Sequence, residues 1–334
     1  MATAGGTPAP AGDNLKRLTD LYRMMVRIRT FEETALEAYK AGEIPGPLHV
    51  SFGQEAIPAG VCASLRQDDR LTSNHRGHGH ALAKGADAAT MYLELYGREG
   101  GYCGGKGGSM HIADFSVGML GANGVVAGGL PIAVGAAQGL KLLKSDAIVV
   151  CMFGDGATNR GPFLEALNWA AIYTLPVLFV CEDNGVAAHT ETRTVTAGEG
   201  PAARANAIGV PAISIDGNDP LTVEETAARL IGEVRGGGGP CMIHARTYRW
   251  SGHTATDAAA WRDPKQVEAA KTRCPIARLK AVLVERGIAP AQLDEIAGAA
   301  RAEMQAGRKA ANAAPWPSMA SAFDDVQDAG AVHG

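Results

Sequence analysis

The chain has 334 residues, 46% of them hydrophobic, and a formal net charge of −4 at pH 7. This length and composition suit a globular protein with a substantial core, and the small negative charge excludes the basic surface that nucleic acid or an anionic membrane would require. Six cysteines are scattered without a C-x-x-C pair, which favours reduced thiols in a cytoplasmic protein over a disulfide framework.

The first stretch, MATAGGTPAPAGDN, has neither an apolar signal core nor an arginine-rich amphipathic pattern. Its Gly, Ala and Pro content predicts a flexible tail over residues 1–14, and the lack of a leader pattern favours a cytoplasmic location. Residues 15–325 are expected to form one domain, because no internal repeat or strong linker interrupts them, and residues 326–334 a second flexible tail. No stretch approaches the ~20 consecutive apolar residues of a membrane span, so no membrane partner is expected.

The N-terminal half is predicted to hold one long helix followed by loops. Apolar residues at helical spacing predict a helix over residues 15–41, which Gly42 and Pro45 bring to an end. The segments NHRGHGH (74–80) and GGKGGSMH (104–111) are too rich in glycine for core elements. They are expected to form loops around a ligand.

From residue 147 onward, strand and helix patterns alternate. Strands are predicted at 147–153, 177–181, 212–215 and 241–245. One helix is predicted at 162–173, and a capping box of Thr222 and Glu225 predicts the start of another. Alternation of this kind predicts an α/β fold with a doubly wound, mostly parallel sheet. The long first helix and helices from about residue 263 would extend it at both ends.

A carboxylate between two glycines follows the first of these strands. The apolar run stops at Gly154-Asp155-Gly156, and the next strand ends in CEDNG, which contains Asn184. Ligands of open α/β sheets bind at the carboxyl ends of strands, where the N–H groups of the following helix face phosphate, so both segments are expected in one crevice. A bare Asp would repel a diphosphate unless a divalent cation lay between them. Asp155 and Asn184 are therefore predicted to hold Mg²⁺.

Each segment also has a purely structural interpretation. Gly-Asp-Gly is a common turn, and Asn-Gly is a frequent loop signal. A dinucleotide-binding fingerprint would need glycine at position 159, which is Asn159, and an acidic residue ~20 positions further on. The joint occurrence of both segments at strand ends, with a helix between them, favours the metal and diphosphate site.

Several long motifs in the same order resemble a known family. GDGATNRGPFLEALNWAAIYTLPVLFVCEDN (154–184) resembles the thiamine diphosphate motif, which opens with Gly-Asp-Gly and closes with Asn. EIPGPLHVSFGQEA, NHRGHGHALAKG, GGKGGSMHIADFSVGMLGANGVV and YRWSGH together resemble the alpha subunit of the dehydrogenase component of 2-oxo acid and acetoin dehydrogenase complexes. The likeness runs from about residue 15 to the C-terminal helices. The middle segments are most similar to acetoin dehydrogenase, with pyruvate dehydrogenase next.

This resemblance implies a set of contacts to thiamine diphosphate and Mg²⁺. The implied Mg²⁺ ligands are the side chains of Asp155 and Asn184 and the backbone carbonyl of Val186. Arg76 would bind a phosphate as a fixed charge-assisted donor, with His75 beside it. Backbone groups supply the remaining implied cofactor contacts, at Gly124, Val126, Gly156 and Ala157.

The resemblance also implies the reaction. The cofactor would perform carbanion chemistry on acetoin or a 2-oxo acid such as pyruvate, and the acyl unit would pass to a lipoyl-bearing acyltransferase. His253 and His49 match family histidines that face the substrate, and imidazole suits proton transfer near pH 7. His78 and His80 could simply brace the loop.

One part of the family's active site is missing from this chain. Activation of the cofactor needs a carboxylate that the family supplies from the pyrimidine-binding domain of a β subunit. Only one doubly wound sheet is predicted here. The resemblance therefore implies a protein that is inactive alone and works as an α₂β₂ heterotetramer, with the cofactor at the α/β interface.

The chain departs from the family pattern after the second strand. The family usually has Glu-Asn-Asn followed shortly by Tyr, whereas this chain has EDNGV at 182–186. The metal ligand is kept, and Asp183 adds negative charge near the site.

Two alternative functions stay open. His75, His78 and His80 could ligate zinc in a hydrolase, although the glycines between them fit a phosphate loop equally well and Gly-Asp-Gly would be unexplained. The chain could also be a non-catalytic subunit that only binds the cofactor.

Overall fold

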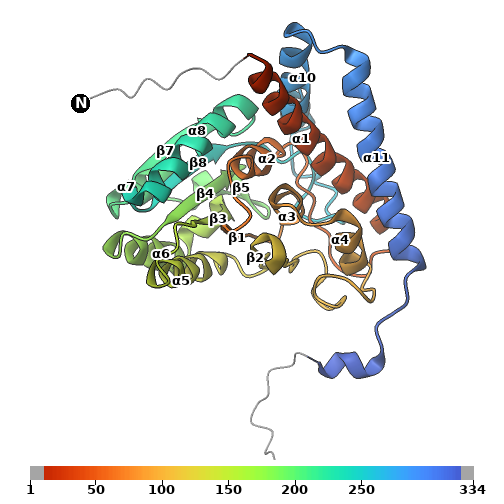
Figure 1. Cartoon of the computed structure of the whole chain (residues 1–334), viewed down its shortest axis with the longest axis horizontal. Helices are drawn as coiled ribbons and strands as arrows, with labels where there is room; N and C mark the ends of the chain where they lie inside the picture. Colours follow the sequence, from red (N-terminus) through yellow and green to blue (C-terminus); the bar gives the residue numbers. More distant parts are fainter. Residues whose placement is uncertain (1–10, 325–334) are drawn as a thin grey trace, which may run out of the picture.

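A parallel six-stranded sheet forms the centre of the molecule (Figure 1). The structure, a computed structural model, describes residues 11–324. The strand order is β2-β1-β3-β4-β8-β7, and every neighbouring pair is parallel. The strands are β1 Arg70–Thr72, β2 Met119–Gly121, β3 Val149–Gly154, β4 Val177–Asp183, β7 Ala212–Asp216 and β8 Cys241–Arg246. Two short antiparallel strands, β5 Val186–Ala187 and β6 Thr190–Glu191, form a separate ribbon.

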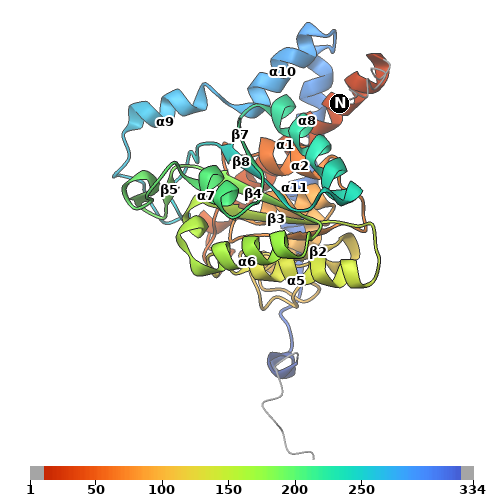
Figure 2. The ribbon, with the colours of Figure 1, turned by 90° about the vertical axis from the view of Figure 1, so that its left-hand side faces the viewer.

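Helices cover both faces of this sheet, so the predicted parallel α/β fold is confirmed. Figure 2 shows α5 and α6 on one side of β3 and β4, and α1, α2 and α8 on the other. These helices are α1 Ala11–Lys40, α2 Ala56–Cys62, α5 Gly129–Leu142, α6 Gly161–Ile172 and α8 Pro220–Glu233. The remaining α-helices are α3 His78–Lys84, α4 Ala88–Leu95, α7 Pro201–Ala207, α9 Pro264–Lys271, α10 Pro275–Glu285 and α11 Pro290–Ala313.

The two central strands are apolar on both faces because both faces are covered. Val150 and Met152 of β3 belong to the core beneath α1 and α2, whereas Val149 and Cys151 belong to the core beneath α5 and α6. Strands buried on both faces carry continuous apolar runs instead of an alternating pattern. The apolar runs at 147–153 and 177–181 therefore locate β3 and β4 closely.

The C-terminal helices close the molecule on the side of α1. α11 packs along both α1 and α4, and α10 packs against α1. Their buried residues join the same core as α1. This agrees with the prediction of helices after residue 263.

The ends of the chain differ from the sequence-based expectation at one point. α1 begins at Ala11, four residues before the predicted start of the first helix. Residues 1–10 and 326–334 of the expected tails lie outside the described part of the chain.

The expectation of loops in the glycine-rich middle is confirmed for residues 104–111 and is wrong for the end of NHRGHGH. The second half of NHRGHGH begins helix α3, and α4 follows directly. Gly79 explains why glycine occurs inside a buried helix, because a Cβ there would lie 3.1 Å from Ile28 Cγ2 and 3.3 Å from Pro58 Cγ. Glycine at this position lets α3 pack closely against α1 and α2.

The predicted capping box of Thr222 and Glu225 is also wrong. α8 begins at Pro220, and its N-cap is Asp219, three residues before the predicted N-cap Thr222. Asp219 Oδ1 accepts the Leu221 N–H at 3.1 Å, and the Thr222 hydroxyl donates to Asp219 Oδ2 at 2.8 Å. Thr222 therefore supports the cap from inside the first turn.

All six cysteines fall within the described residues and are unpaired. Between residues 11 and 324, no helix combines the length and the apolar character needed to cross a lipid bilayer.

Candidate functional site

A pocket of about 280 Å³ opens at the carboxyl ends of β3 and β4. Ligands of open α/β sheets bind at this edge. The pocket brings together every residue that was predicted to bind the cofactor or Mg²⁺ or to act in catalysis. These are His49, His75, Arg76, Gly124, Val126, Asp155, Gly156, Ala157, Asn184, Val186 and His253.

Asp155 is a buried carboxylate with one unpartnered oxygen. It is the first residue after β3, and its Oδ2 is buried without a hydrogen-bond partner among the described residues. Burial, helped by the nearby charge of Asp183, raises the pKa of Asp155 to about 6, and a hydrogen bond with Thr192 opposes the shift. A buried carboxylate without a partner is costly, so its environment favours a bound cation.

Asn184 lies in the same pocket at the end of the neighbouring strand. β3 and β4 pair up to Gly154 and Glu182, so Asp155 and Asn184 both follow the last paired residues. The Asn184 side chain donates from Nδ2 to Gln54 Oε1 at 3.3 Å and accepts the Val186 N–H at Oδ1 at 3.2 Å. These two bonds fix the orientation of the side-chain amide while leaving a lone pair on Oδ1.

Residues 155–157 begin a short 3₁₀-helix, Asp155–Asn159. The first N–H groups of a helix have no partner within it, which makes Gly156 and Ala157 suitable donors to an anion. Gly156 also has a packing role, because a Cβ there would lie 2.8 Å from Ala187 Cβ.

Arg76 is nearly fully buried and is held by backbone carbonyls. Its Nη1 donates to Val50 O and its Nη2 to His253 O, both at 2.7 Å, and Nη2 lies 3.1 Å from His253 Nδ1. Burial, followed by repulsion from Arg249, lowers the pKa of Arg76 to about 9. The guanidinium has five N–H donors, so part of its donor capacity remains for a ligand in the pocket.

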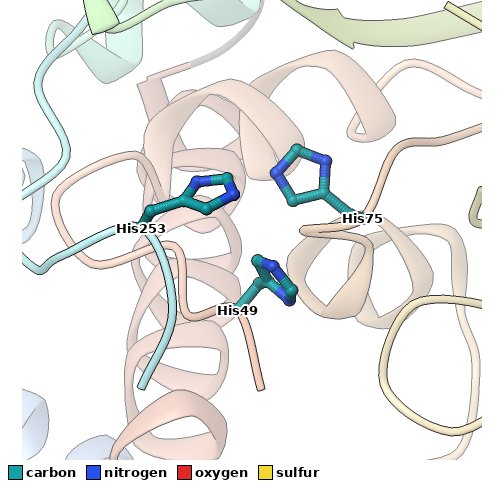
Figure 3. Close-up of side chains that lie close together, drawn as sticks. All are labelled: His49, His75 and His253. Atoms are coloured by element: carbon teal, nitrogen blue, oxygen red, sulfur yellow. The ribbon is translucent and has the colours of Figure 1, made fainter. Parts of the chain in front are cut away.

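Three histidines from separate segments meet at the pocket. Figure 3 shows the rings of His49, His75 and His253 around a common space. Their ring centroids lie 4.9, 5.1 and 5.4 Å apart. Among the His, Cys, Asp and Glu side chains of the described chain, they form the one group of three or more whose ligand atoms lie within 4.8 Å of one another.

These histidines are neutral at physiological pH. Burial, followed by repulsion from Arg76, lowers the pKa to about 3 for His49, about 2 for His75 and about 4 for His253. The same positive charges, from Arg76 and Arg249, disfavour a metal cation between the rings and favour an anionic or neutral polar ligand. Neutral imidazoles can both donate and accept hydrogen bonds there.

The loop that carries His253 is fixed by a carboxylate. Asp257 accepts the backbone N–H of His253 at Oδ2 and the N–H of Ala259 at Oδ1, at 2.7 and 2.8 Å. His189 Nε2 lies 3.2 Å from the same Oδ2. The backbone position of His253 therefore depends on a neighbouring acidic residue four positions later.

His78 and His80 do brace the surrounding structure, as expected. The two ring nitrogens of His78 bond to Glu32 and Ser109, both at 2.9 Å. Those of His80 lie 2.7 Å from Ser73 Oγ and 3.2 Å from Glu182 Oε1. Because their nitrogens are used in this way, the zinc ligand set of His75, His78 and His80 is not formed.

The sequence did not single out several polar residues that line the pocket, among them Gln54, Glu182 and Arg249. Each lies within a quoted motif, but nothing in the local pattern distinguishes it from its neighbours. The expected charge of Asp183 is present, since it raises the pKa of Asp155, and Asp183 is itself bonded to His244 at 2.7 Å.

Comparison with known proteins identifies the chain's relatives. Residues 22–320 match the family described as "Dehydrogenase E1 component". The chain is 40% identical over 311 residues to the alpha subunit of an acetoin:2,6-dichlorophenolindophenol oxidoreductase from Cupriavidus necator, covering 92% of this chain and 93% of that protein. It is 46% identical over 242 residues to the Bacillus subtilis protein of the same name, covering 72% of this chain and 73% of the other. It is 35% identical over 315 residues to a pyruvate dehydrogenase E1 component subunit alpha from Porphyra purpurea, covering 91% and 90%.

Proposed function

The chain belongs to the dehydrogenase E1 component family, and on this premise we propose that it is the alpha subunit of a thiamine diphosphate- and Mg²⁺-dependent dehydrogenase component. Acetoin is the favoured substrate, because the relatives named for acetoin are more similar to this chain than the relative named for pyruvate. Pyruvate or another 2-oxo acid is the second candidate.

One observation carries this proposal: Asp155 presents a buried, unpartnered carboxylate oxygen in the same pocket as Asn184 and Arg76. Oxygen ligands of this kind suit Mg²⁺, and a nearby guanidinium suits phosphate. The pocket residues therefore fit a diphosphate bound through a cation. Asp155, Asn184 and the Val186 carbonyl would hold the metal ion. The diphosphate and ring contacts would come from His75, Arg76, Gly124, Val126, Gly156 and Ala157.

When bound, thiamine diphosphate supplies an electron sink for breaking a bond next to a carbonyl group. The chain's own residues bind, orient and exchange protons. His253 and His49 are neutral, so each can donate an N–H to a substrate oxygen or accept a proton from it. Arg76 keeps His253 in place by bonding to its carbonyl and lying beside its ring.

The proposal includes a β subunit, a lipoyl-bearing acyltransferase as acyl acceptor, and an α₂β₂ assembly. The relatives are named as alpha subunits, which supports a partner subunit. Val125 and Val126 line the pocket and are exposed, as expected where a second subunit completes it.

We also propose a cytoplasmic location and one domain over residues 15–325. The unpaired cysteines support that location.

The test uses the complex of this chain with its β subunit. Calorimetry should show Mg²⁺-dependent binding of thiamine diphosphate, and oxidation of acetoin should proceed with 2,6-dichlorophenolindophenol as the artificial electron acceptor. Asp155→Asn should abolish both, because a metal ligand and its charge are lost. Asp68→Asn, on the surface, should change neither. Unchanged affinity in Asp155→Asn would rule out the metal assignment.

A panel of acetoin, pyruvate and branched 2-oxo acids would then identify the substrate. Cofactor binding without turnover of any of them would favour the non-catalytic alternative.

A further inference from the structure

A buried carboxylate at the end of α4 organises the glycine-rich loop that follows. Glu94 is fully buried and accepts four backbone N–H bonds. Its Oε1 accepts from Gly107 at 2.7 Å and Gly108 at 2.9 Å, and its Oε2 from Cys103 at 2.7 Å and Gly105 at 2.9 Å. These bonds fill the four acceptor sites of an ionised carboxylate.

The loop is shaped to surround this side chain. Gly104, Gly105 and Gly108 have φ values of 63°, 76° and 65°, in the left-handed region that glycine enters without strain. A Cβ at Gly101 would lie 2.6 Å from Glu94 Oε2. Successive N–H groups that converge in this way form a concave anion site, and the protein's own carboxylate occupies it.

The far end of the same loop forms part of the pocket. Met110 lines the pocket, and Ile112 accepts the N–H of Ala122 at 2.8 Å. At Gly124, a Cβ would lie 3.4 Å from His111 Nε2 and 3.7 Å from Met110 Sδ. The loop therefore supports the segment that carries Gly124 and Val126.

We propose that Glu94 is a positioning residue, which holds residues 101–112 as a wall of the pocket through its four amide bonds. An amide side chain cannot replace it, because glutamine offers one oxygen with two acceptor sites and turns an NH₂ group toward the other two N–H donors. What the pocket binds rests on the proposed function, but the loop's dependence on Glu94 does not.

The test compares Glu94→Gln and Glu94→Asp with Glu99→Gln in the complex with the β subunit. Glu99 is the matched control, because it is an exposed glutamate five residues away. Hydrogen exchange measured by mass spectrometry should show amides 103–108 exchanging at least about tenfold faster in Glu94→Gln, since bonds to a charged acceptor are lost. Amides of β3 and β4 should keep their wild-type rates.

Cofactor titration gives a second, functional measurement. In Glu94→Gln the thiamine diphosphate concentration for half-maximal activity should rise about tenfold, while kcat should change by less than about twofold, because Glu94 does not reach the reacting atoms. Glu94→Asp keeps the charge and should recover part of the affinity. Glu99→Gln should match the wild type.

Unchanged loop exchange in Glu94→Gln would overturn the proposal. So would faster exchange with a cofactor requirement equal to that of Glu99→Gln, because Glu94 would then be structural only. If Glu94→Gln does not assemble, Glu94→Asp is judged by the same two measurements. If the wild-type complex does not bind thiamine diphosphate, the proposed function fails, and the loop exchange rates alone decide the role of Glu94.

Discussion

Asp155 and the pocket histidines have pKa values shifted in opposite directions by the same cause. Burial disfavours any charged form, so it raises the pKa of the acid and lowers the pKa of the bases. Asp155 is shifted to about 6 and His253 to about 4. At pH 7 the histidines are therefore neutral and Asp155 is mostly ionised. The carboxylate consequently bears a desolvation cost that a cation would relieve.

This cost predicts that Asp155→Asn stabilises the complex when cofactor is absent. Folding raises the pKa of Asp155 from 3.8 to about 6. The folded protein therefore bears no ionisation penalty below pH 3.8, and the penalty reaches its full value as the pH rises through about 6. At pH 8 the wild type therefore bears a penalty on the order of 3 kcal/mol, from about two pKa units at 1.36 kcal/mol each. The side chain of Asn cannot ionise. The thermal unfolding midpoint of Asp155→Asn should therefore exceed that of the wild type at pH 8 and approach it at pH 5.

Thermal unfolding of the cofactor-free complex at these two pH values measures the effect, with Asp68→Asn as the surface control. A lower midpoint for Asp155→Asn at pH 8 would show that Asp155 has a stabilising partner in the assembled protein.

His253→Gln should lower kcat by about 10²–10⁴-fold, the range for loss of a positioned acid or base. Cofactor affinity should change little, because Arg76 bonds to the backbone carbonyl of His253 and the backbone is fixed by Asp257. Steady-state kinetics and calorimetry on the same preparation separate the two effects. The control is Lys265→Gln, an exposed residue twelve positions further along the chain, which should keep its activity. An equal loss in both variants would remove His253 from the chemistry.

At the scale of elements, the position of α3 depends on a glycine. Gly79→Ala should destabilise the protein by about 1–3 kcal/mol, because the new methyl group overpacks against Ile28 and Pro58. Gly232→Ala is the matched control, since Gly232 is an exposed helical glycine of α8 with open space around it. It should stabilise by about 0.4–1 kcal/mol through the unfolded chain. Chemical denaturation of both variants measures these opposite signs, and a stable Gly79→Ala would show that the helices can separate.

The same helix shows where sequence patterns fail. β3 and β4 were predicted closely because a strand buried on both faces leaves a long apolar run. β1 and β2 have three residues each, too few for any period to appear. α3 was missed because its glycine and histidine residues are buried by packing and by bonds to distant side chains, which no local pattern records. The buried surroundings of these residues form only when segments that are distant in the sequence pack together in the folded protein.

The pocket residues likewise include some that the sequence could reveal and some that it could not. Asp155 and Asn184 could be found because glycines and strand ends mark them in the sequence. Gln54 and Arg249 could not, because each is a single polar residue whose place in the pocket depends on a loop from another part of the chain.

At the scale of the whole molecule, one outer face is unusually apolar. α5 and α6 lie side by side as the outer layer on one side of the sheet (Figure 2). Their inner sides already form a core with the sheet. Their outer sides still expose large apolar residues, Ile132, Leu142, Leu143, Leu164, Trp169, Ile172 and Tyr173. A helix that is apolar on both sides is expected to be buried on both sides.

We expect the β subunit of the proposed assembly to cover this face, because the segment directly before α5 carries Val125 and Val126, which are exposed at the pocket. Ile172, 63% exposed, is the test position. Ile172→Glu should weaken the α/β complex by about 2 kcal/mol or more, as for a charge placed at the centre of an interface. Val284→Glu on α10, where the native residue is 40% exposed, is the control and should assemble normally. Sedimentation velocity of dilution series measures both. If Ile172→Glu assembles as the wild type does, the β subunit covers another face. If the variant loses the α–α contact but keeps the α–β contact, this face binds a second copy of the chain.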